Sequence, residues 1–403
     1  MKDKILNLRK KRKVMRVIYV STYIPQKCGI ATFTKDVTTA INMLNPYALA
    51  EIMAIVKDGE ENIEFPWEVK YKIKRNDIES YVQAANYINN SGCDVVLIEH
   101  EFGIFGGDFG DYAVKFAKMI KKPLIMTCHT IPREAETDYG KVLKELGKIV
   151  CGITVMAKDS QKKLIESYGV DKKKIACIPH GTPDIPLTST EDYKKQKGLM
   201  GKLVLGSINL ISENKGLEYT IEAVAKVAKI YPEVVGMIIG QTHPGVIEFE
   251  GEKYRKFLKK KVKELGIVKN IKFIDKYLPL DDLILWLKTI DFYVTPYLDP
   301  EQSSSGALAY AIGAGKACIS TPYKYARENL ANGRGVIVPF RDSEAIAESI
   351  LKIWKDKEKM KIMQKKAYQY GRFMTWTNVA LQHLDMFELM AKKDKKYVEK
   401  HKK

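Results

Sequence analysis

Two series of short apolar runs constrain the fold of this chain more than any other feature of its sequence. Runs of strand length, rich in Val and Ile, alternate with amphipathic stretches of helical length in the first half, and the same alternation returns in the second half. Strands that are apolar on both faces are typical of parallel sheets covered by helices. The sequence therefore predicts an α/β protein with two doubly wound, Rossmann-like units.

The segments expected to form strands are 14–20, 51–56, 94–100, 123–129, 152–157 and 175–179 in the first half, and 203–208, 234–240, 271–275, 291–296, 317–322 and 335–340 in the second. The clearest helical patterns are 32–44, 80–90, 216–232, 281–290, 303–316 and 375–393.

The boundary between the two units is expected in segment 181–202, where Pro, Thr, Ser and Lys replace the periodic pattern. This predicts a first domain over residues 1–185 and a second over 200–374. The helical stretch 375–395 is one helix more than the second unit needs, so we expect it to pack back on the first. Ligands of open parallel sheets bind beyond the carboxyl ends of the strands. Chemistry is therefore expected at strand-to-helix junctions, in a deep cleft that the two domains face.

Composition excludes several classes of protein. No apolar stretch of the 403 residues approaches the roughly 20 residues of a membrane span. The basic N-terminal residues lead into a strand pattern and not into a signal peptide. The six cysteines stand singly, without the spacing of a metal site, which indicates reduced thiols in a cytoplasmic protein.

The net charge of +18 allows more than one interpretation. Glutamates stand between most of the lysines, which is typical of the solvated surfaces of many thermophile proteins. Two basic runs, Arg9–Lys13 and Lys392–Lys403, could instead give weak peripheral contact with an anionic membrane. Nucleic-acid binding is not expected, because aromatic residues do not cluster with the basic ones.

The first unit offers candidate ligand residues at three junctions. Gly29 and Ile30 open the first helix, where glycine and free N–H groups let a sugar or an anion approach closely. The surrounding loop is not a G-x-G-x-x-G fingerprint, which argues against a nicotinamide dehydrogenase.

His100 and His129 end two further predicted strands, where each imidazole would face the cleft. Glu99 and Glu101 flank His100 and are candidates for binding sugar hydroxyls. The glycine-rich segment 102–111 is interpreted either as a mobile loop over the substrate or as a plain connection.

The second unit has two junctions suited to phosphate. Lys215 and Gly216 precede a predicted helix, so the ammonium group adds to the partial positive charge of the helix N-terminus. Further along, Glu301 is placed to accept hydrogen bonds from sugar hydroxyls. A helix rich in small residues follows it, and its first residues offer hydroxyl and N–H groups to a phosphate: Ser303, Ser304, Ser305 and Gly306.

Taken in order, these motifs resemble those of glycosyltransferase family 4, retaining enzymes with the GT-B fold of two Rossmann-like domains facing across a deep cleft. The resemblance runs from the first strand and its glycine loop through Ile178–Gly181 to the Lys-Gly element and the segment around Glu301. It implies that Lys215 holds the donor diphosphate, that His129 lies against the donor sugar, and that Glu301 binds that sugar. The backbone of residues 302–305 would then touch the diphosphate.

Two positions depart from the family pattern. The family has an arginine five residues before its lysine, where this chain has Leu210, and a second glutamate eight residues after the first, where this chain has Ala309. Both departures fall on the nucleotide side of the donor.

The sequence thus predicts retaining transfer of a hexosyl group, mannosyl or glucosyl, from a nucleotide-diphosphate sugar to a carbohydrate or other hydroxyl acceptor, with no cofactor and no essential metal. A glycoside phosphorylase of the same fold, which uses orthophosphate or sugar 1-phosphate, is the nearest alternative. A non-catalytic sugar- or nucleotide-binding relative is the third.

Overall fold

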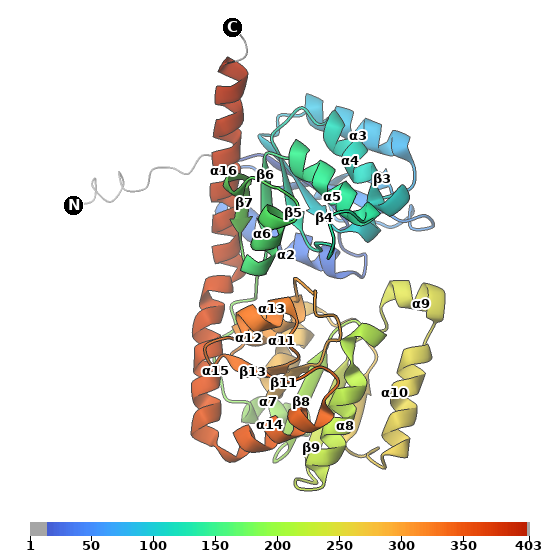
Figure 1. The fold of residues 1–403 in the computed structure, drawn as a ribbon, viewed down its shortest axis with the longest axis vertical. Coiled ribbons are helices and arrows are strands. Elements are labelled where there is room, and N and C mark those ends of the chain that lie inside the picture. The colour runs from blue at the N-terminus through green and yellow to red at the C-terminus, as the bar shows by residue number, and fades with distance from the viewer. Residues whose placement is uncertain (1–13, 401–403) are drawn as a thin grey trace, which may run out of the picture. The chain divides into compact units, whose positions relative to one another are not determined.

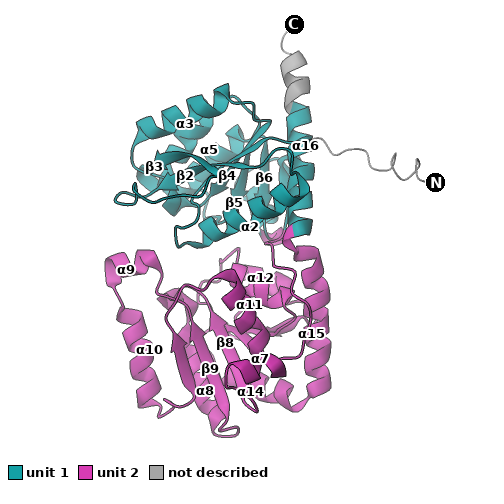
Figure 2. Cartoon of the chain, turned by 180° about the vertical axis from the view of Figure 1, so that it is seen from behind, with its two compact units in different colours: residues 1–156, 160–178, 377–403 teal, residues 157–159, 179–376 magenta. Residues whose placement is uncertain are grey.

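The structure is a computed structural model that describes residues 14–400, with the side chains of residues 14–393. The chain forms two compact units (Figures 1 and 2). The first unit ends its main stretch at Met156 and adds Ser160–Ile178 and the C-terminal helix from Thr377; the second comprises Ala157–Asp159 and Pro179–Trp376. The basic run Arg9–Lys13 lies outside the described residues.

The first unit is built on a seven-stranded parallel sheet in the order β3-β2-β1-β4-β5-β6-β7. Its strands are β1 (Val17–Ser21), β2 (Glu51–Val56), β3 (Val69–Lys74), β4 (Val95–His100), β5 (Leu124–Cys128), β6 (Gly152–Val155) and β7 (Ile175–Cys177). Its helices are α2 (Gly29–Leu44), α3 (Ile78–Asn90), α4 (Tyr112–Met119), α5 (Asp138–Ile149), α6 (Lys158–Glu166) and α16 (Trp376–Lys400).

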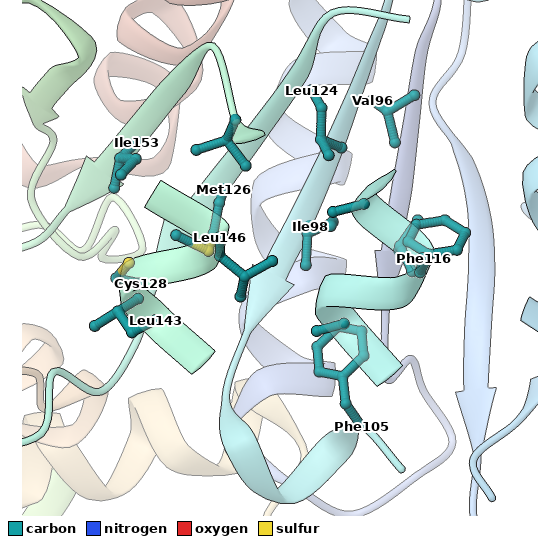
Figure 3. Close-up of a cluster of buried hydrophobic side chains, with 14 of the residues drawn as sticks. Val96, Ile98, Phe105, Phe116, Leu124, Met126, Cys128, Leu143, Leu146 and Ile153 are labelled. Atoms are coloured by element: carbon teal, nitrogen blue, oxygen red, sulfur yellow. The ribbon is translucent and has the colours of Figure 1, made fainter. Parts of the chain in front are cut away.

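Helices cover both faces of this sheet. On one face, side chains of β1, β4 and β5 pack with those of α3, α4 and α5 in one apolar core. Figure 3 shows the part of this core that β4, β5, α4 and α5 form. On the other face, the hydroxyl groups of Ser21 on β1 and Thr34 on α2 lie 2.7 Å apart. The C-terminal helix α16 packs there too: Phe387 contacts Tyr19 edge to face, and Met386 lies so close to Gly152 that a Cβ atom would come within 2.7 Å of it.

The second unit has a six-stranded parallel sheet in the order β10-β9-β8-β11-β12-β13. Its strands are β8 (Leu203–Ile208), β9 (Val234–Ile239), β10 (Ile271–Ile274), β11 (Phe292–Thr295), β12 (Ala317–Ser320) and β13 (Gly335–Ile337). Its helices are α7 (Glu191–Gln196), α8 (Leu217–Ala228), α9 (Pro244–Glu250), α10 (Lys253–Glu264), α11 (Leu280–Thr289), α12 (Gly306–Gly313), α13 (Lys324–Asn329), α14 (Ser343–Lys355) and α15 (Lys357–Gly371). Its core joins α8, α10, α14 and α15 to the strands.

The prediction of two Rossmann-like parallel-sheet domains is confirmed, and all twelve expected strands are present. One strand, β3, was not expected. It lies at the edge of its sheet, and its lysines Lys70, Lys72 and Lys74 alternate with less polar residues. An edge strand that is open to solvent on one side does not need the continuous apolar run by which the other strands were identified.

Segment 181–202, expected to lack periodic structure, contains the short helix α7. A buried ion pair holds this helix to the sheet: the ammonium group of Lys194 lies 2.9 Å from the carboxylate of Asp291, and both side chains are at most 5% exposed. No helix in the described part of the chain combines the length and the apolar character needed to cross a membrane.

Candidate functional site

The loop between β1 and α2 leaves open space at the start of its helix. Cys28 caps α2, because its thiol accepts a hydrogen bond from the backbone N–H of Ala31. Gly29 is exposed, and a Cβ atom on it would meet no other atom within 4 Å. Since packing within the protein does not require glycine there, Gly29 and the half-buried Ile30 stay predicted ligand contacts.

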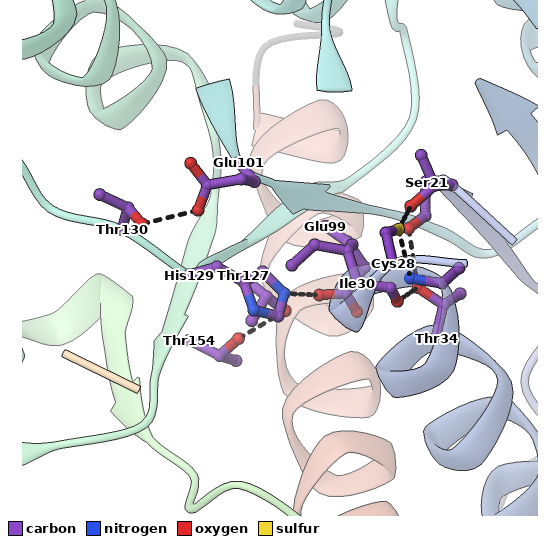
Figure 4. Close-up of polar contacts among 12 residues, drawn as sticks. Ser21, Cys28, Ile30, Thr34, Glu99, Glu101, Thr127, His129, Thr130 and Thr154 are labelled. Atoms are coloured by element: carbon purple, nitrogen blue, oxygen red, sulfur yellow. Dashed lines mark hydrogen bonds and ion pairs between the residues drawn. The ribbon is translucent and has the colours of Figure 1, made fainter. Parts of the chain in front are cut away.

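His129 is held by a buried carboxylate (Figure 4). Its Nε2 lies 2.8 Å from Oε2 of Glu99, and because a carboxylate only accepts hydrogen bonds, Nε2 carries the proton. The ring of Phe33 lies edge to face against the imidazole, 4.9 Å away between ring centroids. These contacts fix the ring of His129 at the end of β5.

Glu99 itself does not have the place that the sequence predicted. Its side chain is 0% exposed, so it cannot bind a sugar hydroxyl directly in this conformation. Its second oxygen, Oε1, has no hydrogen-bond partner among the described residues. We therefore correct its role: Glu99 is enclosed at the end of β4 and holds the ring of His129.

The predicted orientation of His100 is also wrong. The imidazole is 0% exposed and lies between two rings, Phe102 at 4.7 Å and Phe105 at 5.8 Å between centroids. Neither ring nitrogen has a hydrogen-bond partner within the described part of the chain. Burial, with a smaller effect of His129, lowers the pKa of His100 to about 3, so it is neutral at physiological pH. His100 is a core residue.

Glu101 ties the ends of β4 and β5 together. One carboxylate oxygen accepts a hydrogen bond from the N–H of Phe102, at 3.1 Å, and the other accepts from the hydroxyl of Thr130, at 2.6 Å (Figure 4). The side chain is half-buried, so Glu101 stays a predicted contact for sugar hydroxyls.

The glycine-rich segment 102–111 is packed and does not form an open lid. It folds into two 3-10 turns, Phe102–Ile104 and Asp108–Gly110. A Cβ atom on Gly106 would collide with the carbonyl of Arg75, and one on Gly107 with the carboxylate of Asp111. Of the two interpretations of this segment, the structure favours the structured connection.

In the second unit, the Lys215-Gly216 element docks on the loop that follows β11. Gly216 has φ 59°, and a Cβ atom on it would collide with the carbonyl oxygen of Pro296. The N–H of Leu298 donates to the carbonyl of Asn214 at 2.9 Å. Glycine is needed here both for the left-handed backbone and for this close approach. The two junctions predicted to bind phosphate are therefore neighbours.

Lys215 lies at this contact with its charge partly desolvated. Its Nζ is 4.2 Å from the centroid of the Tyr297 ring, a cation–π contact. Burial lowers the pKa of Lys215 to about 8, although the nearby carboxylate of Asp299 acts in the opposite direction. An ammonium group in such surroundings gains more from a bound anion than a solvated lysine does.

Helix α12 begins at Gly306, three residues later than the expected pattern 303–316, and Ser305 is its N-cap. The buried Ser305 hydroxyl accepts a hydrogen bond from the N–H of Leu308 at 3.3 Å, which gives it a structural role. The N–H groups of residues 306 and 307 lie in the first turn of the helix, where backbone N–H groups have no acceptor within the helix and can bind a ligand. Ser303 and Ser304 are half-buried beside this turn and stay predicted phosphate contacts.

Glu301 is half-buried and already engaged. Its Oε2 lies 2.7 Å from the ammonium group of Lys324, at the start of α13, and its N–H donates to the side chain of Asp299. A sugar hydroxyl would have to share this carboxylate with Lys324. Its role toward the sugar stays a prediction.

Three residues near these loops were not identified from the sequence. The Nδ1 of His180 donates a hydrogen bond to the carbonyl of Gly181. Its Nε2 lies against Gly306, the first residue of α12, where a Cβ atom would come within 2.7 Å of this nitrogen. Asn209 directly follows β8, and both polar atoms of its amide are buried without a partner among the described residues. The ring of Tyr297 contacts Lys215. Each of the three directly follows a strand expected from the sequence, and this place at a strand end is the signal that could have identified them.

The two departures from the family pattern occupy different environments. Leu210 is half-buried in the loop after β8, whereas Ala309 is 0% exposed on α12. A glutamate at position 309 would enter the core of the second unit, so this position cannot bind ribose in the present arrangement. Among the side chains that the structure describes, no group of three or more His, Cys, Asp or Glu residues is arranged to hold a metal ion.

Comparison with known proteins agrees with this description. Residues 189–370 match the family model of glycosyl transferases group 1. Mannosylfructose-phosphate synthase of Agrobacterium fabrum is 24% identical over 313 residues, which are 70% of this chain and 66% of that protein.

Two solved structures share the fold over 93% of this chain and 99% of theirs. They are Anabaena Alr3699/HepE in complex with UDP and glucose, with a TM-score of 0.74 at 16% identity, and sucrose-phosphate synthase from Thermosynechococcus elongatus, with a TM-score of 0.75 at 14% identity. The two wound parallel sheets of this chain therefore have the GT-B fold of these structures. Over residues 189–370, the chain is similar to the glycosyl transferases group 1 family.

Proposed function

We propose that this glycosyltransferase is a retaining enzyme that moves a hexosyl group, mannosyl or glucosyl, from a nucleotide-diphosphate sugar to a hydroxyl of a carbohydrate. The observation that carries the proposal is the position of Lys215. Its partly desolvated ammonium group stands where the β8 junction docks on the loop leading to α12. The names of the relatives support a sugar donor of this kind, since they include a structure with bound UDP and glucose and two sugar-phosphate synthases.

In this proposal the second unit holds the donor by charge and by helix N–H groups, without an essential metal. Lys215 and the first turn of α12 stabilise the diphosphate as negative charge develops on it. Glu301 and His129 orient the sugar, and Glu99 keeps His129 in one tautomer. The leaving phosphate accepts the acceptor proton on the same face of the sugar, so the chain supplies mainly position and electrostatic stabilisation.

A phosphorylase is the second candidate, because Leu210 and the buried Ala309 leave the nucleotide side of the donor with fewer polar contacts than the family pattern has. Two assays separate the candidates: release of nucleoside diphosphate with a carbohydrate acceptor, and formation of sugar 1-phosphate from oligosaccharide plus orthophosphate. Turnover only in the second assay would overturn the nucleotide-sugar proposal.

Substitutions at the sugar-facing residues test the same proposal. His129→Gln is expected to lower kcat by more than tenfold, because a small misplacement of the reacting groups can lower the rate by about 10²-fold. Glutamine keeps a donor toward Glu99, so the melting temperature should stay near that of the native protein. Glu301→Gln is expected to behave similarly. Full activity in both variants would show that these residues do not meet the sugar.

We also propose a cytoplasmic protein whose basic runs give weak peripheral contact with anionic membranes. Co-sedimentation with vesicles that contain phosphatidylserine is expected at low salt and should disappear as salt screens the charges. Removal of residues 1–13 should weaken this binding and leave turnover unchanged. A truncated protein without activity would contradict the second expectation.

A further inference from the structure

Two half-exposed aromatic rings meet on the first unit, beyond the carboxyl ends of neighbouring strands. Phe109 follows β4, and Tyr139 follows β5 at the start of α5. Phe109 is 44% exposed and Tyr139 is 45% exposed. Their rings are perpendicular, with centroids 5.0 Å apart. Side chains at this edge of a parallel sheet are in the usual place for ligand contact.

The backbone of Phe109 is held in a conformation that bulky residues rarely adopt. Its φ and ψ are 55° and 22°, and it lies between Gly107 and Gly110, which also have positive φ. A glycine or an asparagine would take this conformation with less strain. Strained residues are concentrated at functional sites, because selection for function keeps them in place. Stability alone therefore does not explain a large ring at position 109, and a function in binding does.

The second ring has a firm support behind it. Tyr139 packs edge to face on Phe102, which is only 7% exposed and in turn contacts His100. A Cβ atom on Gly110 would come within 2.8 Å of the carbonyl of Phe102, so the turn that carries Phe109 lies directly on the same support. Rigid aromatic surfaces bind ligands with little loss of conformational freedom.

We propose that Phe109 and Tyr139 form a carbohydrate-binding platform on which a sugar ring of the acceptor packs; this rests on the proposed function. The C–H face of a pyranose packs on an aromatic face, while its hydroxyl groups need acceptors around it. Exposed carboxylates precede both rings in the chain, at Asp108 and Asp138. Asp138 also pairs with Lys141, 3.0 Å between Oδ1 and Nζ. Both exposed carboxylates can accept hydrogen bonds from hydroxyl groups, so the platform suits a saccharide.

Saturation-transfer NMR with maltotriose, cellotriose and β-1,4-mannotriose tests the platform in the full-length protein. At least one trisaccharide is expected to receive saturation, chiefly at its ring C–H protons. Phe109→Gly and Phe109→Asn should weaken its binding at least tenfold while the melting temperature stays equal or rises, because both residues relieve the backbone. Tyr47→Ala is the matched control: Tyr47 is 88% exposed in the same unit but precedes β2, at the opposite edge of the sheet.

Either of two results would overturn the platform. The first is that none of the three sugars binds, or that their binding does not depend on Phe109. The second is a fall of several degrees in the melting temperature of both Phe109 variants. Binding of UDP and GDP, measured in parallel, tests the donor proposal separately. Nucleotide binding without saccharide binding would reject only the platform. Saccharide binding that depends on Phe109 in a protein without transfer from any donor would reject only the proposed reaction.

Discussion

Lys215→Ala is expected to weaken binding of UDP or GDP by roughly 10- to 100-fold, because a hydrogen bond between charged groups contributes about 1.5–3 kcal/mol. Alanine removes the ammonium group beside Tyr297 and leaves Gly216 and its contact with Pro296 in place. The fold should therefore survive, and the removal of a partly desolvated charge should not lower the melting temperature.

Calorimetric titration of each nucleotide measures this effect. Lys260→Ala is the control, because Lys260 is exposed on α10 and pairs only with the exposed Glu264 among the contacts described for it. The control should bind nucleotide as the native protein does. Equal affinities in all three proteins would show that Lys215 is not a donor ligand.

The pH dependence of binding gives a sharper test of the same residue. The pKa of Lys215 is lowered to about 8, so the free protein loses this charge as pH rises through 8. A bound diphosphate stabilises the charged form and raises the pKa, so affinity should fall above pH 8 and binding should take up a proton there. The Lys215→Ala variant should lack this decline. A native protein whose affinity is constant between pH 7 and 9 would contradict the assignment.

The sequence carried enough information for the fold because the central strands of both sheets are buried on both faces and show it in their composition. The histidines show where such reasoning fails. His100 is the last residue of β4 and still pairs with Cys128 of β5, and its side chain is enclosed by the rings of Phe102 and Phe105 from the segment that follows the strand. His129 stands one residue beyond β5 and is held by Glu99 from the neighbouring strand. A shift of one residue in the end of a strand decides whether a histidine lies in the core or at the candidate site, and sequence patterns do not locate strand ends that accurately.

The donor side shows a second limit. Lys215 and Glu301 were identified singly, each from its place at a junction. Two contacts depend on how loops that are distant in the sequence meet: Gly216 with Pro296, and His180 with Gly306. No local sequence pattern encodes such a meeting of loops. The same holds for Lys324, which begins α13 and pairs with Glu301. Residues that act through such pairs are found only once the strand order is known.

The second large effect is expected on stability, at the buried carboxylate of Asp291. It lies 2.9 Å from the ammonium group of Lys194, and one of its oxygens accepts the backbone N–H of Val204 at 2.8 Å. Lys316 is buried close by and donates to the carbonyl of Ile290, and burial lowers its pKa to about 8. One carboxylate thus balances two buried ammonium groups and joins α7 to the sheet.

Asp291→Ala is expected to lower the free energy of unfolding of the second unit by about 3–5 kcal/mol, the usual effect of removing one partner of a buried ion pair. Urea denaturation followed by circular dichroism measures it. Lys361→Ala is the control: it breaks the pair with Glu358, in which both side chains are at least 70% exposed, and should change stability by less than about 1 kcal/mol. The double variant Lys194→Met/Asp291→Leu removes this ion pair but leaves Lys316 charged, so it should recover only part of the loss, because apolar residues can replace a buried ion pair. If Asp291→Ala were no more harmful than Lys361→Ala, water would have to reach these ammonium groups, and α7 would not depend on this pair for its place on the sheet.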